Sequence, residues 1–273
     1  MKNTRLLSLG VLLSVGTLLT ACSSDDGASD GSPAGSAWTL TVKATKGGNE
    51  ATTRALLLDE KDNTLYATWK TTENVHVYSK DEYLGKLNPD VNAATANLKG
   101  SLDTKDENYY RGLAKSNLDL QFPKAGQISY SGQNGTLEYI SSNYDWAKAT
   151  VEIEGIDLST RTIKPYYGTV TFENQQAIVK FTLKDGAGNS LNASSLKISA
   201  LGLIDFGETP GDVIITPTVP TNVIWAALRG ISENYVTLTA TVDKVTYTYT
   251  TKEPKSFENG KYYDITVKMT QKP

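Results

Sequence analysis

Cysteine and histidine are almost absent from this chain of 273 residues, which contains one of each. A single cysteine excludes a disulfide bond within the chain, and the two residues together cannot build a Cys/His zinc site. Most acid–base catalysis that depends on histidine is excluded as well. The 27 basic and 30 acidic side chains give a formal net charge of −3, which argues against the basic surface that nucleic-acid binding needs. We therefore expect a protein that is not an enzyme, binds no nucleic acid and needs no cofactor or metal ion.

What the sequence does contain is a series of short segments in which apolar and polar residues alternate, as they do in half-buried strands. In the first segment Trp38, Leu40 and Val42 alternate with polar residues. In the last segment Tyr263, Ile265, Val267 and Met269 do the same, which predicts a strand with one buried face. This last strand spans 262–269, and the predicted strands between the first and the last are 64–69, 74–78, 149–153, 168–172, 177–183, 196–200, 213–216, 223–228, 235–242 and 245–250.

The pattern predicts an all-β protein without a long helix. Residues 184–189 and the pair Asp243 and Lys244 are expected to form hairpin turns. Many short strands at near-regular spacing are typical of a sandwich or a barrel. A polar stretch at 154–165 suggests a domain boundary, with one β-sandwich over 37–158 and a second over 159–273.

The N-terminus has the features of an export signal. Lys2 and Arg5 precede an apolar run over 6–19 that is too short to span a bilayer comfortably. The sequence LTAC at 19–22 looks like a bacterial lipobox, which predicts a signal peptide over 1–21 and a lipid on Cys22. The alternative is an ordinary signal peptide with an unrelated cysteine. Residues 22–36 are expected to be a flexible tether, and its acidic start resembles the tether of surface lipoproteins in Bacteroidetes; a plain solvated linker is the alternative.

Other residues have the chemistry of possible sites, but their surroundings in the sequence point to simpler roles. His76 lacks catalytic partners and is expected at a surface or rim. The acidic run at 59–63 misses the spacing of a calcium loop, so a solvated turn is favoured. Aromatic pairs could line a sugar-binding platform, although aromatic residues in strands are more often core. These residues are Tyr109, Tyr110, Trp146, Tyr166, Tyr167 and Trp225.

Several segments, taken in order, resemble fimbrillin-like proteins over nearly all of the chain after Ala37. These segments are YATWK at 66–70, VHVY at 75–78, SGQNGTL at 131–137, YDWAKA at 144–149, QAIVKF at 176–181 and FENGKYYDITV at 257–267. The resemblance implies a type V pilus subunit of Bacteroidetes, built as two transthyretin-like β-sandwiches. It also implies an outer-membrane lipoprotein precursor that ends in a cell-surface pilus.

The same resemblance implies how such a subunit assembles. An arginine-specific protease removes the first strand, and the C-terminal strand of a neighbouring subunit takes its place. In this chain the implied cleavage lies between Arg54 and Ala55, which would release the strand of Trp38, Leu40 and Val42. A surface arginine without a role is the alternative. Release would bare an apolar groove and two strand edges that recruit another strand.

The predicted function is a structural or adhesive pilus subunit whose partners are other subunits. Four residues follow Met269, too few to fill a groove left by a strand of about six residues. This favours a subunit that accepts a strand without giving one, as at the tip of a pilus, where it would meet a host or bacterial surface receptor. The alternative is that the last strand itself is released to a neighbour, at the cost of opening its own domain. The rival prediction is a permanently anchored surface lipoprotein that binds glycans.

Overall fold

The computed structural model describes residues 37–47, 57–59, 64–103, 105–123, 129–203 and 210–273. All of them belong to the unit that spans residues 35–273. The signal peptide, Cys22, the tether, Arg54 and Ala55 lie outside the described residues, so the predictions made for them stay predictions.

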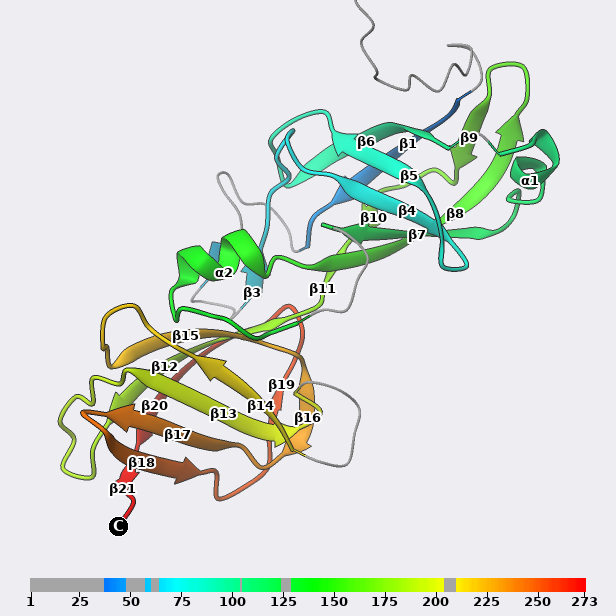
Figure 1. Ribbon diagram of the computed structural model, residues 1–273. Helices are drawn as coiled ribbons and strands as arrows, with labels where there is room; N and C mark the ends of the chain where they lie inside the picture. The colour runs from blue at the N-terminus through cyan, green and yellow to red at the C-terminus, as the bar shows by residue number, and fades with distance from the viewer. Residues whose placement is uncertain (1–36, 48–56, 60–63, 104, 124–128, 204–209) are drawn as a thin grey trace, which may run out of the picture. The chain divides into compact units, whose positions relative to one another are not determined.

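The described chain is built mainly of strands, which confirms the predicted all-β fold (Figure 1). Its two helices are short: α1 (Glu107–Arg111) and α2 (Leu137–Asn143). Each begins at a side chain that accepts a hydrogen bond from the first turn, Asp106 for α1 and Thr136 for α2. Among the described residues no helix has the length and hydrophobicity needed to cross a bilayer.

The first sheet runs in the order β10-β1-β6-β5-β4-β7-β8-β11, and β9 pairs with both β1 and β8. The ladder of hydrogen-bonded strands therefore closes on itself. Every second side chain along its strands points inward and contributes to the first core. Its strands are β1 (Trp38–Thr45), β4 (Val75–Ser79), β5 (Glu82–Pro89), β6 (Thr95–Leu102), β7 (Asn117–Phe122), β8 (Ala147–Asp157), β9 (Thr162–Pro165), β10 (Val170–Thr171) and β11 (Glu173–Asn174). A separate pair is formed by β2 (Leu57–Asp59) and β3 (Thr64–Tyr66).

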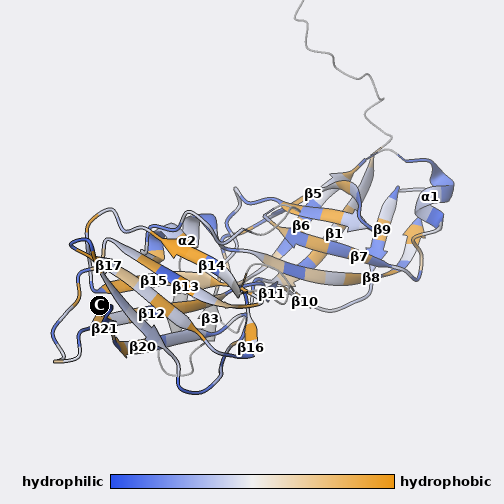
Figure 2. Ribbon diagram, turned by 60° about the horizontal axis from the view of Figure 1, so that its bottom comes forward, coloured by the Kyte–Doolittle hydropathy of each residue, from blue (hydrophilic) through white to orange (hydrophobic). Residues whose placement is uncertain are grey.

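A second core lies between a three-stranded sheet, β15-β12-β20, and a five-stranded sheet, β14-β13-β17-β18-β21. Strands of both sheets supply its side chains, as in a sandwich. The strands are β12 (Ala177–Lys184), β13 (Ser195–Leu201), β14 (Pro210–Ile215), β15 (Val223–Leu228), β17 (Thr237–Val242), β18 (Val245–Thr250), β20 (Tyr262–Lys268) and β21 (Thr270–Gln271). A pair formed by β16 (Ile231–Asn234) and β19 (Lys255–Phe257) adjoins them in sequence. Figure 2 shows hydrophobic and hydrophilic residues alternating along these strands.

The division between the two cores differs from the boundary expected after residue 158. That boundary falls in the β8–β9 hairpin, and β9 and β10 still pair with β1 of the first sheet. Conversely, Tyr130, Ile140 and Tyr144 precede β8 in the chain but are buried in the second core. The chain thus passes from one core to the other and back, and the expected boundary stays a prediction. The number of domains stays a prediction.

Both predicted hairpin turns are present, one between two long strands and one closed by a single bridge. Asp243 and Lys244 both have positive φ, 47° and 69°, and they join the antiparallel strands β17 and β18 through a two-residue turn. The turn at 184–189 forms, with Asp185 accepting a hydrogen bond from the amide of Asn189. It closes an isolated bridge between Lys184 and Ser190, after which the chain continues to β13 in the opposite sheet. The bridge is antiparallel, and the amide of Leu191 donates to the carbonyl of Leu183 across the turn, so this hairpin is present but short.

Candidate site for strand exchange around β1

The strand β1 has one face in the first core and the other in solvent. Trp38, Leu40, Val42 and Ala44 are at most 2% exposed, and the residues between them are exposed. The three residues expected to form a displaceable strand, Trp38, Leu40 and Val42, therefore share one buried face. Their displacement itself stays a prediction.

Hydrogen-bonded strands flank β1 on both sides (Figure 1). It pairs antiparallel with β6 along its whole length of eight residues. On its other side it pairs in parallel with β9 at Thr39 and with β10 near Thr45. The amide of Thr39 donates to the carbonyl of Arg161 over 2.9 Å, and the carbonyl of Thr45 accepts from the amide of Phe172 over 2.9 Å. Loss of β1 would thus bare two strand edges at once.

An aromatic pair holds the N-terminal end of β1. The ring of Trp38 stacks on the ring of Tyr110 in α1, with centroids 4.6 Å apart. The hydroxyl of Tyr110 donates to the carbonyl oxygen of Asp103. Burial, more than any neighbouring charge, raises the pKa of Tyr110. The Tyr110 hydroxyl therefore keeps its proton and its hydrogen bond to Asp103. Trp38 is held within β1, so both rings of the stack are held in place.

A buried cation stands at the C-terminal end of β1. Lys46 is fully buried, and its Nζ lies 2.8 Å from Oε1 of Glu73 and 2.8 Å from Oδ2 of Asp145. The same Nζ is 3.8 Å from the ring centroid of Phe122. The nearby indole of Trp69 donates to the carbonyl of Ala44 over 3.2 Å. Sequence reasoning missed this cluster, although Lys46 continues the even-numbered series of buried residues begun by Trp38.

The C-terminal strand is an edge of the second core. Strand β20 pairs in parallel with β12, and β12 is its one partner in the three-stranded sheet. Val267 and Met269 are buried, whereas Tyr263 and Ile265 are partly buried and pack against the same core. After Met269 the chain crosses to the other sheet, where β21 pairs with β18. The predicted strand with one buried face is therefore present.

The other residues weighed in the sequence do not gather into a site. His76 lies beside Tyr83, with ring centroids 5.6 Å apart. Of the acidic run at 59–63 the structure describes Asp59 alone, at the end of β2. Tyr166 and Tyr167 are exposed on the segment after β9. Within the described ranges no group of three or more His, Cys, Asp and Glu side chains could hold a metal ion.

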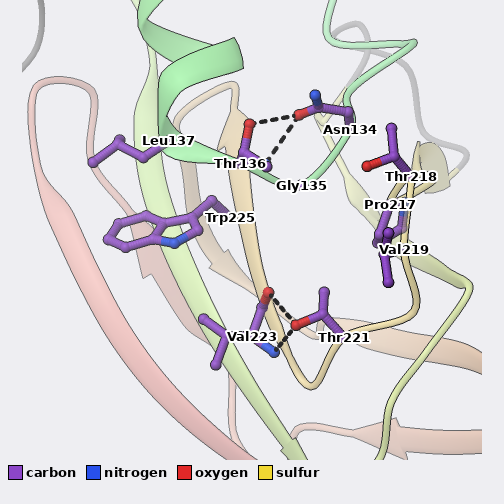
Figure 3. Close-up of a pocket in the computed structure, with 10 residues that line it drawn as sticks. All are labelled: Asn134, Gly135, Thr136, Leu137, Pro217, Thr218, Val219, Thr221, Val223 and Trp225. Atoms are coloured by element: carbon purple, nitrogen blue, oxygen red, sulfur yellow. Dashed lines mark hydrogen bonds between the residues drawn. The ribbon is translucent and has the colours of Figure 1, made fainter.

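An open pocket of about 330 Å³ lies against β15 and the start of α2 (Figure 3). Trp225 lines it together with Leu137, Val223 and the loop of Pro217 and Val219. Of the six aromatic residues considered for a sugar-binding platform, Trp225 alone lines this pocket. Its ring also stacks on Tyr262, with centroids 5.7 Å apart. The six aromatic residues therefore form no shared platform at this pocket.

Among known proteins, similarity to this chain is found in solved structures. No family model matches the sequence, and no curated protein matches it. The chain is similar to the structure of a protein assigned to cell adhesion from Bacteroides ovatus, with 12% identity and a TM-score of 0.42 over 86% of this chain and 95% of that one. It is similar to a fimbrial protein from the same species, with 12% identity and a TM-score of 0.38 over 85% of this chain and 48% of that one. It is also similar to a tip fimbrial protein from Porphyromonas gingivalis, with 10% identity and a TM-score of 0.39 over 85% of this chain and 95% of that one.

Proposed function

We propose that the protein is a fimbrillin-like subunit of a cell-surface pilus, exported as a lipoprotein precursor with a lipid on Cys22. Cleavage between Arg54 and Ala55 frees β1, and a strand of a neighbouring subunit takes its place. The observation that carries this proposal is the position of β1. It is the first strand of the described chain, it is buried on one face and hydrogen-bonded on both sides, and it continues into the segment that contains Arg54.

Cleavage at Arg54 would leave β1 held by non-covalent contacts alone. Burial of Trp38, Leu40 and Val42 contributes about 1.5–3 kcal/mol for each side chain, so an empty groove is unfavourable by several kcal/mol. The main-chain groups of β6, β9 and β10 would also lose their partners. An incoming strand restores both contributions, because it adds main-chain hydrogen bonds and fills the pockets with alternate side chains.

The second part of the proposal is that this subunit accepts a strand from a neighbour and donates none. The pairing and burial of β20 support it. Seven residues of β20 pair with β12, from Tyr262 to Lys268. Release of this strand to a neighbour would expose Val267 and Met269, which are buried in the second core. Acceptance of a strand at the β1 site leaves that core intact. A subunit of this kind ends a fibre, which is the position of a tip protein with an adhesive role.

Processing is tested by treating the exported precursor with an arginine-specific protease and sequencing the new N-terminus. We expect a mature chain that begins at Ala55, and an Arg54→Ala chain that keeps β1. An Arg111→Ala chain is the matched control, since Arg111 is exposed on α1 and should leave maturation unchanged. Maturation of the Arg54→Ala chain to the same N-terminus would contradict the proposal.

The tip position is tested separately on the purified, processed protein. By itself it should form no long filaments, and it should cap strand exchange when mixed with subunits that donate a strand. Long filaments of this protein alone, seen by electron microscopy, would show that its final strand is a donor and that the tip assignment is wrong.

A further inference from the structure

We propose that the groove vacated by β1 selects an incoming strand that carries a basic side chain at the position of Lys46. This inference rests on the proposed function, and it names the chemistry of the partner strand. Lys46 belongs to the segment that leaves with β1, while its two carboxylate partners belong to parts of the chain that stay. The groove therefore keeps the acidic half of a buried ion cluster and loses the basic half.

The two carboxylates are held in place by contacts that do not involve β1. Glu73 closes a turn in which its Oε2 accepts from the amide of Lys70 over 3.0 Å. Its carbonyl also accepts from the side-chain amide of Asn88. Asp145 lies just before β8, where the next residue, Trp146, is tied to Gln175 by a main-chain hydrogen bond of 2.8 Å. Both acceptors would thus remain in position when Lys46 departs.

Among the described residues, Lys46 is the one cation that forms an ion pair with these two carboxylates. The side chains of Glu73 and Asp145 are 13% and 8% exposed. Oδ1 of Asp145 is buried and accepts no hydrogen bond from the described residues. The aromatic rings of Phe122 and Trp69 form the walls around Nζ. Two carboxylates in such a place repel each other and are poorly hydrated, so a strand with a neutral residue there is disfavoured.

Two neighbouring positions fix the register in which the basic residue must arrive. Ala44 is small and fully buried, and its carbonyl accepts from the indole of Trp69. Gly47 has a φ of +68°, and a Cβ there would lie 3.0 Å from Nδ2 of Asn174. The favoured strand therefore has apolar residues at the places of Trp38, Leu40 and Val42. It has a small residue at the place of Ala44, the basic residue at the place of Lys46 and glycine at the place of Gly47.

The strand β20 of this chain fits that pattern poorly. With Tyr263 placed at the position of Trp38, the series of two-residue steps brings Met269 to the position of Ala44. The same series brings Gln271, which carries no charge, to the position of Lys46. The occupant that the groove favours is thus a different subunit whose donor strand has the basic residue, and not a second copy of this one.

The test is a competition between peptides for the full chain after it has been cut at Arg54. The fluorescent probe is a peptide of residues 37–47, and the competitors are the same peptide, its Lys46→Gln form and its Lys43→Gln form. Lys43 lies on the exposed face of β1, so its substitution removes the same charge outside the groove. We expect the Lys46→Gln peptide to compete about 100-fold more weakly and the Lys43→Gln peptide to stay within about threefold of the unchanged peptide.

The outcomes separate this inference from the proposed function. Equal competition by the Lys46→Gln and unchanged peptides would overturn the basic requirement and leave strand exchange standing. No exchange with any peptide, the unchanged one included, would overturn both. A Glu73→Gln, Asp145→Asn double variant should lose most of the preference for the Lys46 peptide. The peptide series on the unchanged chain decides the matter even where this variant fails to fold.

Discussion

The indole ring of Trp38 stacks on the phenol ring of Tyr110 at a centroid distance of 4.6 Å, with the two planes inclined by 28°. Both side chains are nearly or fully buried, and they join the first strand to the short helix α1. We therefore expect Trp38→Ala to destabilise the uncut protein by about 3–5 kcal/mol, because a large buried ring is removed and its cavity remains. Urea unfolding followed by tryptophan fluorescence measures the loss.

The matched control for that change is Thr41→Ala, on the exposed face of the same strand. It should alter the free energy of unfolding by no more than about 0.5 kcal/mol. A Trp38→Ala protein as stable as this control would show that β1 is not packed as described.

In the uncut chain Lys46→Met leaves Glu73 and Asp145 without their cation. We expect a loss of about 3–5 kcal/mol in the free energy of unfolding, since breaking one side of a buried ion pair leaves an uncompensated charge. Lys43→Met, an equal change of charge on the exposed face, should stay within about 0.5 kcal/mol of the unchanged protein. Equal stability of the two variants would argue against a buried ion cluster.

The proposed lipid attachment depends on Cys22, the one cysteine of the chain. A Cys22→Ala precursor should incorporate no labelled fatty acid, whereas a Ser23→Ala precursor should be labelled like the unchanged chain. The measurement is metabolic labelling followed by electrophoresis. Continued labelling of the Cys22→Ala protein would show that Cys22 is not the lipidated residue and would contradict the lipobox interpretation.

Acid should weaken the turn between β8 and β9 through Asp157. Its pKa lies below the ordinary value of 3.8, because its carboxylate accepts from the hydroxyl of Ser159, then from Lys164 and from the amide of Thr160. The unfolded chain therefore binds the proton more readily, so the stabilisation is complete above about pH 3.8 and declines as the pH falls below it.

The measurement is the urea midpoint from neutral pH down to about pH 2.5. An Asp157→Asn protein should show a shallower decline than the unchanged protein. An Asp243→Asn protein, changed in the exposed turn between β17 and β18, should follow the unchanged curve. Identical curves for all three proteins would contradict the assigned role of Asp157.

The sequence predicted those features that depend on local pattern. Alternation located the first strand and the last, and the pair Asp243 and Lys244 located a turn. Strands β5, β6 and β7 were missed; β5, for example, contains Gly85 and Asn88, which are uncommon in strands. Pairing between distant segments was out of reach, because nothing in residues 159–172 shows that they return to β1.

The candidate site divides in the same way. The apolar face of β1 was visible in the alternation of Trp38, Leu40 and Val42. Local sequence rules place a lysine such as Lys46 in solvent, even where it continues an apolar face. Lys46 is buried because two carboxylates from distant positions, Glu73 and Asp145, pair with it. Contacts that compensate a buried charge are set by the tertiary fold, so a single sequence does not reveal them.

The covalent link between β1 and the rest of the chain has a consequence for timing in the proposed assembly. While the link is whole, β1 competes for its groove at an effective concentration in the millimolar range, as tethered segments do. No free strand at ordinary concentration displaces it under those conditions. Once the link is cut, a departed β1 is diluted into the surroundings, and a donor strand competes with it on equal terms. Cleavage of the single peptide bond after Arg54 would therefore determine when assembly starts. Subunits would not join one another before they meet the protease.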